Sequence, residues 1–467
     1  MTRKYGKITI ELISDLRRIV GEKHVRTDPD KLEAYAHDAV TGEKYCKAPD
    51  VVVLPRTPEE ISQIVKLANR EKVPLVPRGA GTGYAGGGVA FEGGVMISVE
   101  RMNTILETDE ENMVVVAEAG VLTGDVQEVA NARGLLYAGD PSSGDSSFIG
   151  GNVATNAGGN KAVKYGTTRQ QVTGLELVTP EGDIVTLGGK LRKDSTGYCL
   201  TQLIVGSEGT LGIITKVILK LVARPKKVVD LLAVFPSVES AIGVVPKIMH
   251  SGVLPVCVEF MDNRAVRSCQ DFLKQTLPFS DNGYYIIVSL DGDNEEVLDE
   301  QCVRVGEICT ENSAMEVFVA DPAKIWKARK AFGEASRARS LIFSAEDIVV
   351  PPSKVPDVIR LVAEIGTKYG VFIHCVAHAG DGNVHADILK EDMAAEEWDE
   401  KLPQLQREIY RQVYALGGKL SGEHGIGYKR RALMEEMTNP VELKMMRAIK
   451  RAIDPNNIMN PGKIFKV

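Results

Sequence analysis

The sequence lacks the features that mark several classes of protein. Its seven cysteines form no Cys-x-x-Cys pair and are odd in number, so neither a disulfide framework nor an iron–sulfur centre is indicated. The polar start has no apolar signal-peptide core, and no apolar run reaches the length of a membrane span. No basic block is present and the formal net charge is −7. We therefore expect a cytoplasmic protein with no nucleic-acid partner and no membrane span.

The length of 467 residues exceeds what one hydrophobic core supports, so several domains are expected. In the first part, two apolar strands flank a helix whose start is marked by Thr57 and Pro58, a pattern typical of a β-α-β unit. After Arg224 and Pro225, strands alternate with helices, which indicates a second domain, α/β or α+β, around its own sheet.

One glycine-rich loop matches the dinucleotide fingerprint but lacks its context. Gly81 to Gly86 read G-x-G-x-x-G after an apolar strand. A nicotinamide site also needs a helix that opens at the third glycine, and the stretch from Gly86 to Gly94 is too rich in glycine to form one. We therefore reject a Rossmann site. The loop from Arg78 to Gly88 is either a flexible turn or a backbone cradle for an anion.

Two further glycine-rich stretches, 150–159 and 206–212, lie in the same half of the chain. Folding alone does not require so many glycines, because each one costs conformational entropy. Three loops without bulky side chains indicate that a large flat ligand lies along the backbone.

Four of the seven histidines fall between residues 374 and 424. His378 and His385 flank an Asp-Gly pair, Asp381 and Gly382, which favours a two-residue hairpin turn. In that turn His378 would lie opposite His385, close enough for both rings to bind one divalent ion. The alternative is a pair of structural histidines. Glu423, between glycines, would complete a His₂Glu set with open positions, as in catalytic metal sites.

Several long motifs occur in a fixed order. They are Pro77 to Gly83, Asp140 to Ser143, Gly150 to Asn152, Thr155 to Gly159, Lys164 to Gly166 and Val205 to Ile214. In this respect the chain resembles the vanillyl-alcohol-oxidase/p-cresol-methylhydroxylase superfamily. Over roughly residues 30–467 it resembles the branch of D-lactate dehydrogenases and glycolate oxidase flavin subunits, which includes D-2-hydroxyglutarate dehydrogenases.

The resemblance implies an α+β fold, with a two-subdomain FAD-binding domain, an α/β substrate (cap) domain and a C-terminal helical segment. The expected bounds are 1–45 for an N-terminal helical segment, 46–223 for the FAD-binding domain, 224–416 for the substrate domain and 417–467 for a segment that returns to the FAD domain. The first loop carries no histidine or cysteine, so FAD is expected to be bound non-covalently.

The same resemblance implies the roles of individual residues. His378, His385 and Glu423 match metal ligands (zinc, iron or manganese), His424 matches the base, and Arg329 matches the arginine that binds the substrate carboxylate. From the sequence alone, Arg329 fits a solvated helix face equally well. The residues expected to contact FAD are Pro77, Arg78, Gly79, Ala80, Gly81, Thr82, Gly83, Pro141, Gly150, Gly151, Asn156, Gly158, Gly159, Tyr165, Gly166, Glu208, Gly209, Ile214 and Asn460.

These parts predict oxidation of a small D-2-hydroxy acid to the 2-oxo acid, with hydride transfer to the flavin. Gly333, Ala345 and Asp387 depart from the pattern of 2-hydroxyglutarate enzymes, which favours D-lactate or glycolate. The alternatives are a D-2-hydroxyglutarate dehydrogenase and a non-catalytic electron-relay flavin subunit. The histidine and carboxylate set speaks against a relay. Because no second redox site is evident, a separate acceptor is expected, an electron-transferring flavoprotein, an iron–sulfur partner subunit or a quinone.

Overall fold

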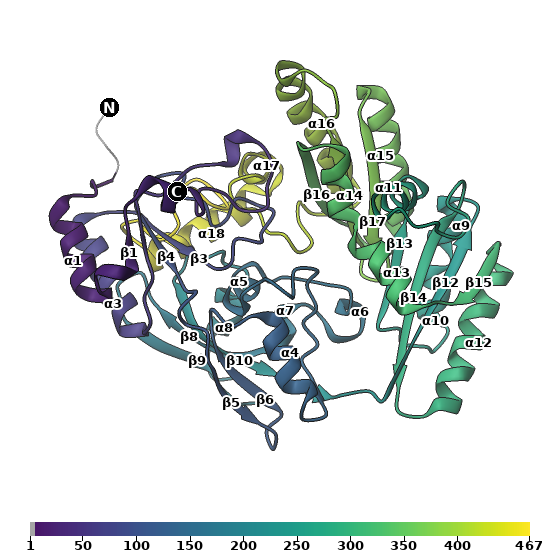
Figure 1. Ribbon diagram of the computed structural model, residues 1–467, viewed down its shortest axis with the longest axis horizontal. Helices are drawn as coiled ribbons and strands as arrows, with labels where there is room; N and C mark the ends of the chain where they lie inside the picture. The colour runs from purple at the N-terminus through teal and green to yellow at the C-terminus, as the bar shows by residue number, and fades with distance from the viewer. Residues whose placement is uncertain (1–4) are drawn as a thin grey trace. The chain divides into compact units, whose positions relative to one another are not determined.

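The computed structural model describes residues 5–467 and divides into two compact units. The first unit consists of residues up to 158, 167–224 and 423–467. The second consists of residues 159–166 and 225–422. Both units mix helices with sheets, which confirms the predicted fold class (Figure 1). Among the described residues, no helix combines the length and apolar character needed to cross a bilayer.

The first unit opens with a four-stranded sheet in the order β1-β2-β4-β3. Strands β2 and β3 are joined by helix α3, as the β-α-β pattern predicted, but β4 lies between them and pairs with both in parallel. The Thr57 side chain accepts a hydrogen bond from the Glu60 amide and Pro58 opens helix α3, so the predicted cap is confirmed. The elements are α1 (Ile10–Val20), β1 (Val25–Arg26), α2 (Pro29–Glu33), β2 (Val51–Val53), α3 (Pro58–Glu71), β3 (Leu75–Arg78) and β4 (Val95–Ser98).

A five-stranded antiparallel sheet, in the order β5-β6-β10-β8-β9, completes this part of the first unit. Its buried residues form one hydrophobic core with those of the four-stranded sheet. The elements are β5 (Ile105–Asp109), β6 (Val114–Glu118), α4 (Thr123–Asn131), β7 (Leu135–Leu136), α5 (Ile149–Thr155), α7 (Thr168–Gln171), β8 (Val172–Val178), β9 (Ile184–Gly188), α8 (Leu200–Ile204), β10 (Ile213–Lys220) and β11 (Val222–Ala223).

The end of the chain is built into the first unit. After helices α17 (Arg431–Met437) and α18 (Pro440–Ile453), the backbone of Ile458 and Asn460 hydrogen-bonds to Leu75 of β3. The Lys450 ammonium is buried and donates to the carbonyl groups of Thr210 and Met459. The C-terminal residues therefore form part of the fold of this unit.

The second unit is built on a seven-stranded sheet in the order β15-β12-β14-β13-β17-β18-β16. Every pairing in it is antiparallel, so of the two arrangements left open by the sequence this unit has the α+β one. Its strands are β12 (Lys227–Phe235), β13 (Cys257–Met261), β14 (Tyr284–Gly292), β15 (Glu316–Val319), β16 (Phe343–Val349), β17 (Phe372–His378) and β18 (Asn383–Leu389).

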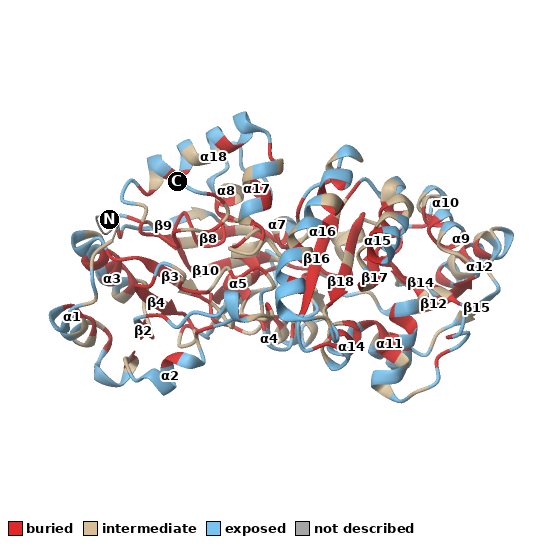
Figure 2. Cartoon of the chain, turned by 90° about the horizontal axis from the view of Figure 1, so that it is seen from above, coloured by how far each residue is buried: buried red, intermediate tan, exposed pale blue. Residues whose placement is uncertain are grey.

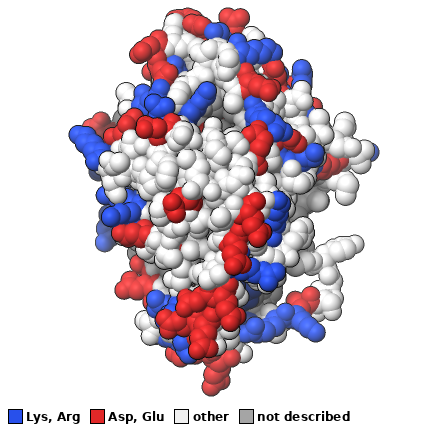
Figure 3. All heavy atoms as spheres, turned by 90° about the vertical axis from the view of Figure 1, so that its right-hand side faces the viewer, with Lys and Arg blue, Asp and Glu red and all other residues white. Residues whose placement is uncertain are grey.

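Helices cover both faces of this sheet, and the strands are largely buried between them, apart from the edge strand β15 and the start of β12 (Figure 2). Helices α11, α13 and α14 form a hydrophobic core on one face, whereas α9, α12 and α15 pack on the other. Acidic and basic side chains lie interspersed on the face shown in Figure 3. The helices are α6 (Ala162–Tyr165), α9 (Val238–Gly243), α10 (Val245–His250), α11 (Asn263–Leu273), α12 (Glu295–Glu311), α13 (Pro322–Lys330), α14 (Phe332–Arg339), α15 (Val355–Tyr369) and α16 (Ala395–Ala415).

Candidate functional site

The two central histidines lie on neighbouring strands of the second unit. His378 ends β17 and His385 lies in β18, but His378 pairs with Asn383, and His385 pairs with Val376. The predicted two-residue turn, with His378 opposite His385, is therefore wrong. The loop contains four residues, because the His378 carbonyl accepts hydrogen bonds from both Asp381 and Gly382.

The corrected register still places both imidazoles together. A shift of two residues preserves the face on which a strand side chain lies. His378 and His385 consequently share one face of the sheet, with ring centroids 5.3 Å apart and ring planes at 88°. The turn needs Gly382, whose φ of +90° lies in the left-handed region that favours glycine.

A buried carboxylate, Glu259 of β13, links His378 to Arg329. His378 Nδ1 lies 2.7 Å from Glu259 Oε1, and Arg329 Nε donates to Glu259 Oε2 at 2.9 Å. All three side chains are buried, so the solvated helix face considered for Arg329 is excluded. Burial raises the pKa of Glu259, but the charges and hydrogen bonds of His378 and Arg329 outweigh it, and the pKa lies below its usual value.

The Arg329 guanidinium retains hydrogen-bonding capacity. Its Nη2 atom lies 2.8 Å from Glu259 Oε2 but makes no hydrogen bond within the described part of the chain, although it is buried. A buried donor without an acceptor is costly, and a planar carboxylate is the group that a guanidinium binds best. Arg329 can therefore take a carboxylate ligand without giving up its pairing to Glu259.

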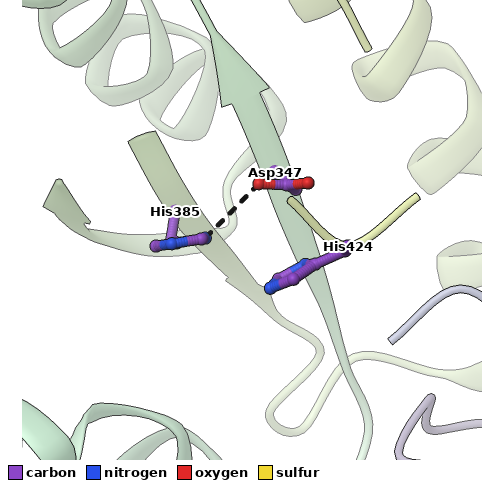
Figure 4. Close-up of side chains that lie close together, drawn as sticks. All are labelled: Asp347, His385 and His424. Carbon is purple, nitrogen blue, oxygen red and sulfur yellow. Dashed lines mark ion pairs between the residues drawn. The ribbon is translucent and has the colours of Figure 1, made fainter. Parts of the chain in front are cut away.

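His385 also lies beside a buried carboxylate. Asp347 of β16 is its register partner, and His385 Nδ1 lies 3.7 Å from Asp347 Oδ1 (Figure 4). Asp347 also accepts hydrogen bonds from Asn383 and Ser421. Each of the two histidines thus has a carboxylate on the Nδ1 side of its ring, and for His378 the contact is within hydrogen-bond distance, as is typical of metal-binding histidines.

Sequence reasoning missed Glu259 and Asp347. Both stand in strands whose other residues are mostly apolar, Cys257–Met261 and Phe343–Val349. An acidic residue in a buried strand is rarely placed there without a partner. That pattern was the available signal.

A third buried histidine, His374, has different neighbours. Its Nε2 atom lies 2.8 Å from Ser336 Oγ, which donates to Asp387 Oδ2 at 2.5 Å. Its ring packs against Phe332 with centroids 4.6 Å apart. Burial, with smaller contributions from nearby arginines, lowers the pKa of His374 to about 3, so its ring is neutral near pH 7.

In the first unit, the glycine-rich loop after β3 is folded around the side chain of Arg78. The guanidinium donates to the carbonyl groups of Gly88 and His37, at 3.0 and 2.8 Å. Gly81 has a φ of +78°, and a methyl group there would overlap the guanidinium. As expected, no helix follows the third glycine of the fingerprint, since residues 86–94 contain only turns and bends.

Glu208 links the third predicted flavin loop, residues 206–212, to the C-terminal segment. Its carboxylate accepts hydrogen bonds from the amides of Ile426 and Gly427, at 2.8 and 2.7 Å. Burial raises its pKa, and those hydrogen bonds oppose the rise. Asn460 donates to the carbonyl groups of Gly87 and Glu208. Residues predicted to lie near one ligand are thus brought together within the first unit.

Glu423 and His424 belong to the first unit and contact its glycine loops. A methyl group at Gly158 would overlap the Glu423 carboxylate. The His424 ring stacks on Tyr84 of the first loop, with centroids 5.2 Å apart. The predicted metal ligand Glu423 and the predicted base His424 therefore lie against two of the three loops predicted to hold the flavin.

The remaining predicted flavin residues lie on the same loops or on the elements next to them. Gly150 and Gly151 open helix α5, Asn156 ends it in a left-handed conformation, and Ile214 lies in β10. Pro77 packs close to Gly209, where a methyl group would lie 3.1 Å from it. Pro141 lies in a turn that precedes α5.

Gly159, Tyr165 and Gly166 belong instead to the second unit. The Tyr165 hydroxyl donates to Asp291 at 2.9 Å, and Lys164 pairs with the same carboxylate. A methyl group at Gly380, in the loop between the two histidines, would lie 2.6 Å from Val163. Residues 159–166 are therefore packed against the loop that joins β17 and β18.

Comparisons with known proteins give the family. The pattern described as FAD linked oxidases, C-terminal domain, matches residues 224–464, and that of an FAD binding domain matches residues 49–188. The D-lactate dehydrogenase of Anaerostipes hadrus is 38% identical over 99% of this chain and 98% of its own. Glycolate oxidase subunit GlcD of Bacillus subtilis strain 168 is 36% identical over 98% and 97%.

A solved structure of p-cresol methylhydroxylase superposes with a TM-score of 0.81 over 98% of this chain and 96% of that one. At 18% identity this likeness shows the fold alone. The D-2-hydroxyglutarate dehydrogenase of Stutzerimonas stutzeri is 35% identical over 97% of this chain and 98% of its own. The chain therefore belongs to the FAD-linked oxidase family and is an FAD-dependent oxidoreductase of the D-lactate, glycolate or D-2-hydroxyglutarate dehydrogenase type.

Proposed function

We propose that this enzyme oxidises a small D-2-hydroxy acid, with D-lactate as the preferred substrate, to the 2-oxo acid. In this proposal FAD is bound non-covalently and a divalent metal ion is required. The observation that carries the proposal is the buried chain from Arg329 through Glu259 to His378, with His385 on the same face. It combines a cation for a carboxylate with a pair of histidines for a metal.

The histidine pair fits a metal ion of the zinc, iron or manganese kind. Glu259 occupies the Nδ1 side of His378, which leaves Nε2 as the nitrogen for the ion. Asp347 also lies on the Nδ1 side of His385, but at 3.7 Å, which is longer than a hydrogen bond. Nitrogen and carboxylate donors suit several of these ions, so the donor set does not select one.

Glu423 is proposed as the third ligand. Gly422, the last residue of the second unit, lies against Asn383, because a methyl group at Gly422 would lie 2.6 Å from the Asn383 side-chain carbon. Asn383 pairs with His378. Glu423 is bonded to Gly422, and consecutive Cα atoms are about 3.8 Å apart, so the continuity of the chain supports this assignment.

Bound FAD supplies a two-electron acceptor, and the bound metal ion supplies a Lewis acid that makes a hydroxyl group easier to deprotonate. The Arg329 guanidinium binds the substrate carboxylate through paired hydrogen bonds. His424 takes the proton of the substrate hydroxyl as general base. The stacking of its ring on Tyr84 restricts the orientation in which it does so.

The proposed cofactor contacts remain those predicted from the sequence, from Pro77 to Gly83 and in the loops that follow. The absence of histidine and cysteine between Arg78 and Thr82 supports non-covalent binding. The hydrogen bonds of Glu208 and Asn460 support a role of both in holding the loops that would contact the flavin.

A monocarboxylate substrate is supported by the surroundings of His385. Asp387, two residues further along β18, is buried and accepts a hydrogen bond from Ser336, so its position adds a polar acceptor but no cation. Gly333 and Ala345 provide neither a polar acceptor nor a cation. A second substrate carboxylate would gain no cationic partner at these three positions.

We further propose that the reduced enzyme passes its electrons to a separate protein in the cytoplasm, an electron-transferring flavoprotein or an iron–sulfur subunit. The seven cysteines of the chain are free and include no Cys-x-x-Cys pair.

The test is flavin bleaching without oxygen. Purified enzyme with FAD is mixed with D-lactate, L-lactate, glycolate or D-2-hydroxyglutarate, before and after treatment with a chelator. We expect D-lactate to bleach the flavin fastest, chelator to abolish bleaching, and added metal to restore it. Faster bleaching by another acid would overturn the substrate assignment, and bleaching that survives complete removal of metal would overturn the metal requirement.

A further inference from the structure

Glu259 contacts both halves of the proposed chemistry in the second unit, the histidine pair through His378 and the proposed carboxylate site through Arg329. It is completely buried in the middle strand β13, directly opposite His378 in the register of β13 and β17. Its two oxygens are divided between two partners, Oε1 for His378 and Oε2 for Arg329. Burying a carboxylate is costly unless it is paired and hydrogen-bonded, and here both oxygens are.

We propose that Glu259 is a positioning residue that orients His378 toward a metal ion and Arg329 toward the substrate carboxylate. The inference rests on the proposed function, because it presupposes that the two partners bind metal and substrate. It goes beyond that function by assigning the coupling of both binding events to one carboxylate that touches neither ligand.

The hydrogen bond to His378 fixes the ring in two respects. It makes Nδ1 the protonated nitrogen, so Nε2 carries the lone pair that a metal ion needs. It also fixes the rotation of the ring about its Cα–Cβ and Cβ–Cγ bonds. Carboxylates in this position change metal affinity by about 10–100-fold when they are removed.

The contact with Arg329 orients the guanidinium. With Nε donating to Oε2 and Nη2 lying 2.8 Å from the same oxygen, the plane of the guanidinium is set. A fork held in one plane loses less entropy when it binds a carboxylate than a mobile one does. Loss of Glu259 is therefore expected to weaken substrate binding as well as metal binding.

The substitution Glu259→Gln tests the charge and the hydrogen bonds of Glu259 without changing the size of the side chain. Glutamine has the same shape, but its amide offers one acceptor and one donor group. If the carbonyl accepts from His378, the NH₂ group faces the donors of Arg329. If the amide is flipped, it donates to His378 Nδ1 and leaves the proton on Nε2, the nitrogen needed for the metal ion. We expect the dissociation constant for Zn²⁺, measured by competition with a chromophoric chelator, to rise about 10–100-fold. We also expect KM for the 2-hydroxy acid to rise.

Glu346→Gln is the matched control. Glu346 is also completely buried in the same sheet, but it faces helix α16, where it pairs with Tyr410 and Gln406. The same change in charge and burial there is expected to alter thermal stability and to leave the Zn²⁺ affinity unchanged. If both variants lose Zn²⁺ affinity equally, the effect is one of general destabilisation and the proposal fails.

A second variant, Glu259→Asp, covers the case in which Glu259→Gln does not fold. It keeps the charge but is shorter by one methylene group, so it cannot reach both partners. Zn²⁺ affinity or KM must then change relative to wild type, and wild-type values for both would overturn the proposal.

The His378→Ala variant distinguishes the two levels of the argument. If it loses Zn²⁺ binding while Glu259→Gln retains wild-type affinity, the metal site stands and the role of Glu259 is overturned. If His378→Ala also retains wild-type affinity, the metal site is not where we propose it, and both proposals fail.

Discussion

The two ends of strand β17 each carry a buried histidine on the same face of one sheet, yet their surroundings differ in kind. At one end, His374 contacts a serine hydroxyl and an aromatic ring, and its pKa falls to about 3. At the other end, His378 contacts a buried carboxylate and the edge of a second imidazole. The two histidines therefore differ in the partner of the ring and not in burial, and a carboxylate on Nδ1 is the arrangement typical of metal-binding histidines.

The strongest test of this comparison applies one substitution to both ends. In His378→Asn we expect turnover to fall by about 10³-fold, because Lewis-acid stabilisation is worth several kcal/mol. In His374→Asn we expect metal affinity to be retained and the free energy of unfolding to fall by about 1–3 kcal/mol. Anaerobic single-turnover kinetics and urea unfolding measure these effects. Equal loss of turnover in both variants would show that His378 and His374 do not differ in function.

Arg329→Lys tests whether the arginine near His378 binds the substrate carboxylate. A lysine keeps the charge but cannot pair in two-pronged fashion with both Glu259 and a carboxylate. We expect KM for the 2-hydroxy acid to rise about 10–100-fold, the equivalent of about 1.4–2.8 kcal/mol. Metal affinity should remain that of wild type. Steady-state kinetics with a metal titration in parallel checks both, and an unchanged KM would return Arg329 to a structural role.

The low pKa of His374 also predicts how the free energy of unfolding depends on pH. His374 stays neutral in the folded protein down to about pH 3, whereas in the unfolded chain it binds a proton below about pH 6.5. The unfolded state therefore binds more protons between these values, and stability falls as the pH falls through that range. At pH 5 the loss is about 2 kcal/mol relative to pH 8.

His374→Asn removes this contribution and is the control for it. The difference in unfolding free energy between wild type and variant should shrink by about 2 kcal/mol from pH 8 to pH 5. Urea unfolding at the two pH values measures it. A difference that stays constant would show that His374 is not held neutral.

The smallest effect concerns the contact between a flavin loop and the proposed third ligand. A methyl group at Gly158 overlaps the Glu423 carboxylate, whereas one at Gly306, in helix α12, meets no atom within 4 Å. We expect Gly158→Ala to weaken Zn²⁺ binding about tenfold and Gly306→Ala to leave it unchanged. Equal Zn²⁺ affinities in the two variants would show that the loop at Gly158 does not influence the proposed metal site.

The sequence predicted the parts of the fold that local patterns encode. The cap of helix α3 and the alternation of strands and helices after Arg224 both follow from residue periodicity and turn chemistry. Helix α5 was not predicted, because glycines at 150 and 151 disfavour a helix locally and only its packing in the core stabilises it.

For the candidate site, the sequence suggested residues but not their geometry. Asp381 and Gly382 predicted a two-residue turn, yet the His378 carbonyl accepts two amides and a longer loop forms. The pairing of His378 with Arg329 through Glu259 joins strands and a helix that are distant in sequence. No spacing rule connects residues 259, 329 and 378, since tertiary packing alone brings them together.

The most direct test of the central claim is anomalous X-ray diffraction from crystals of the enzyme grown with FAD and Zn²⁺ or Mn²⁺. We predict one anomalous peak about 2.0–2.2 Å from the Nε2 atoms of His378 and His385 and from a Glu423 oxygen. A peak held by other residues, or no peak at these histidines in an enzyme that oxidises D-lactate at full rate, would contradict the account.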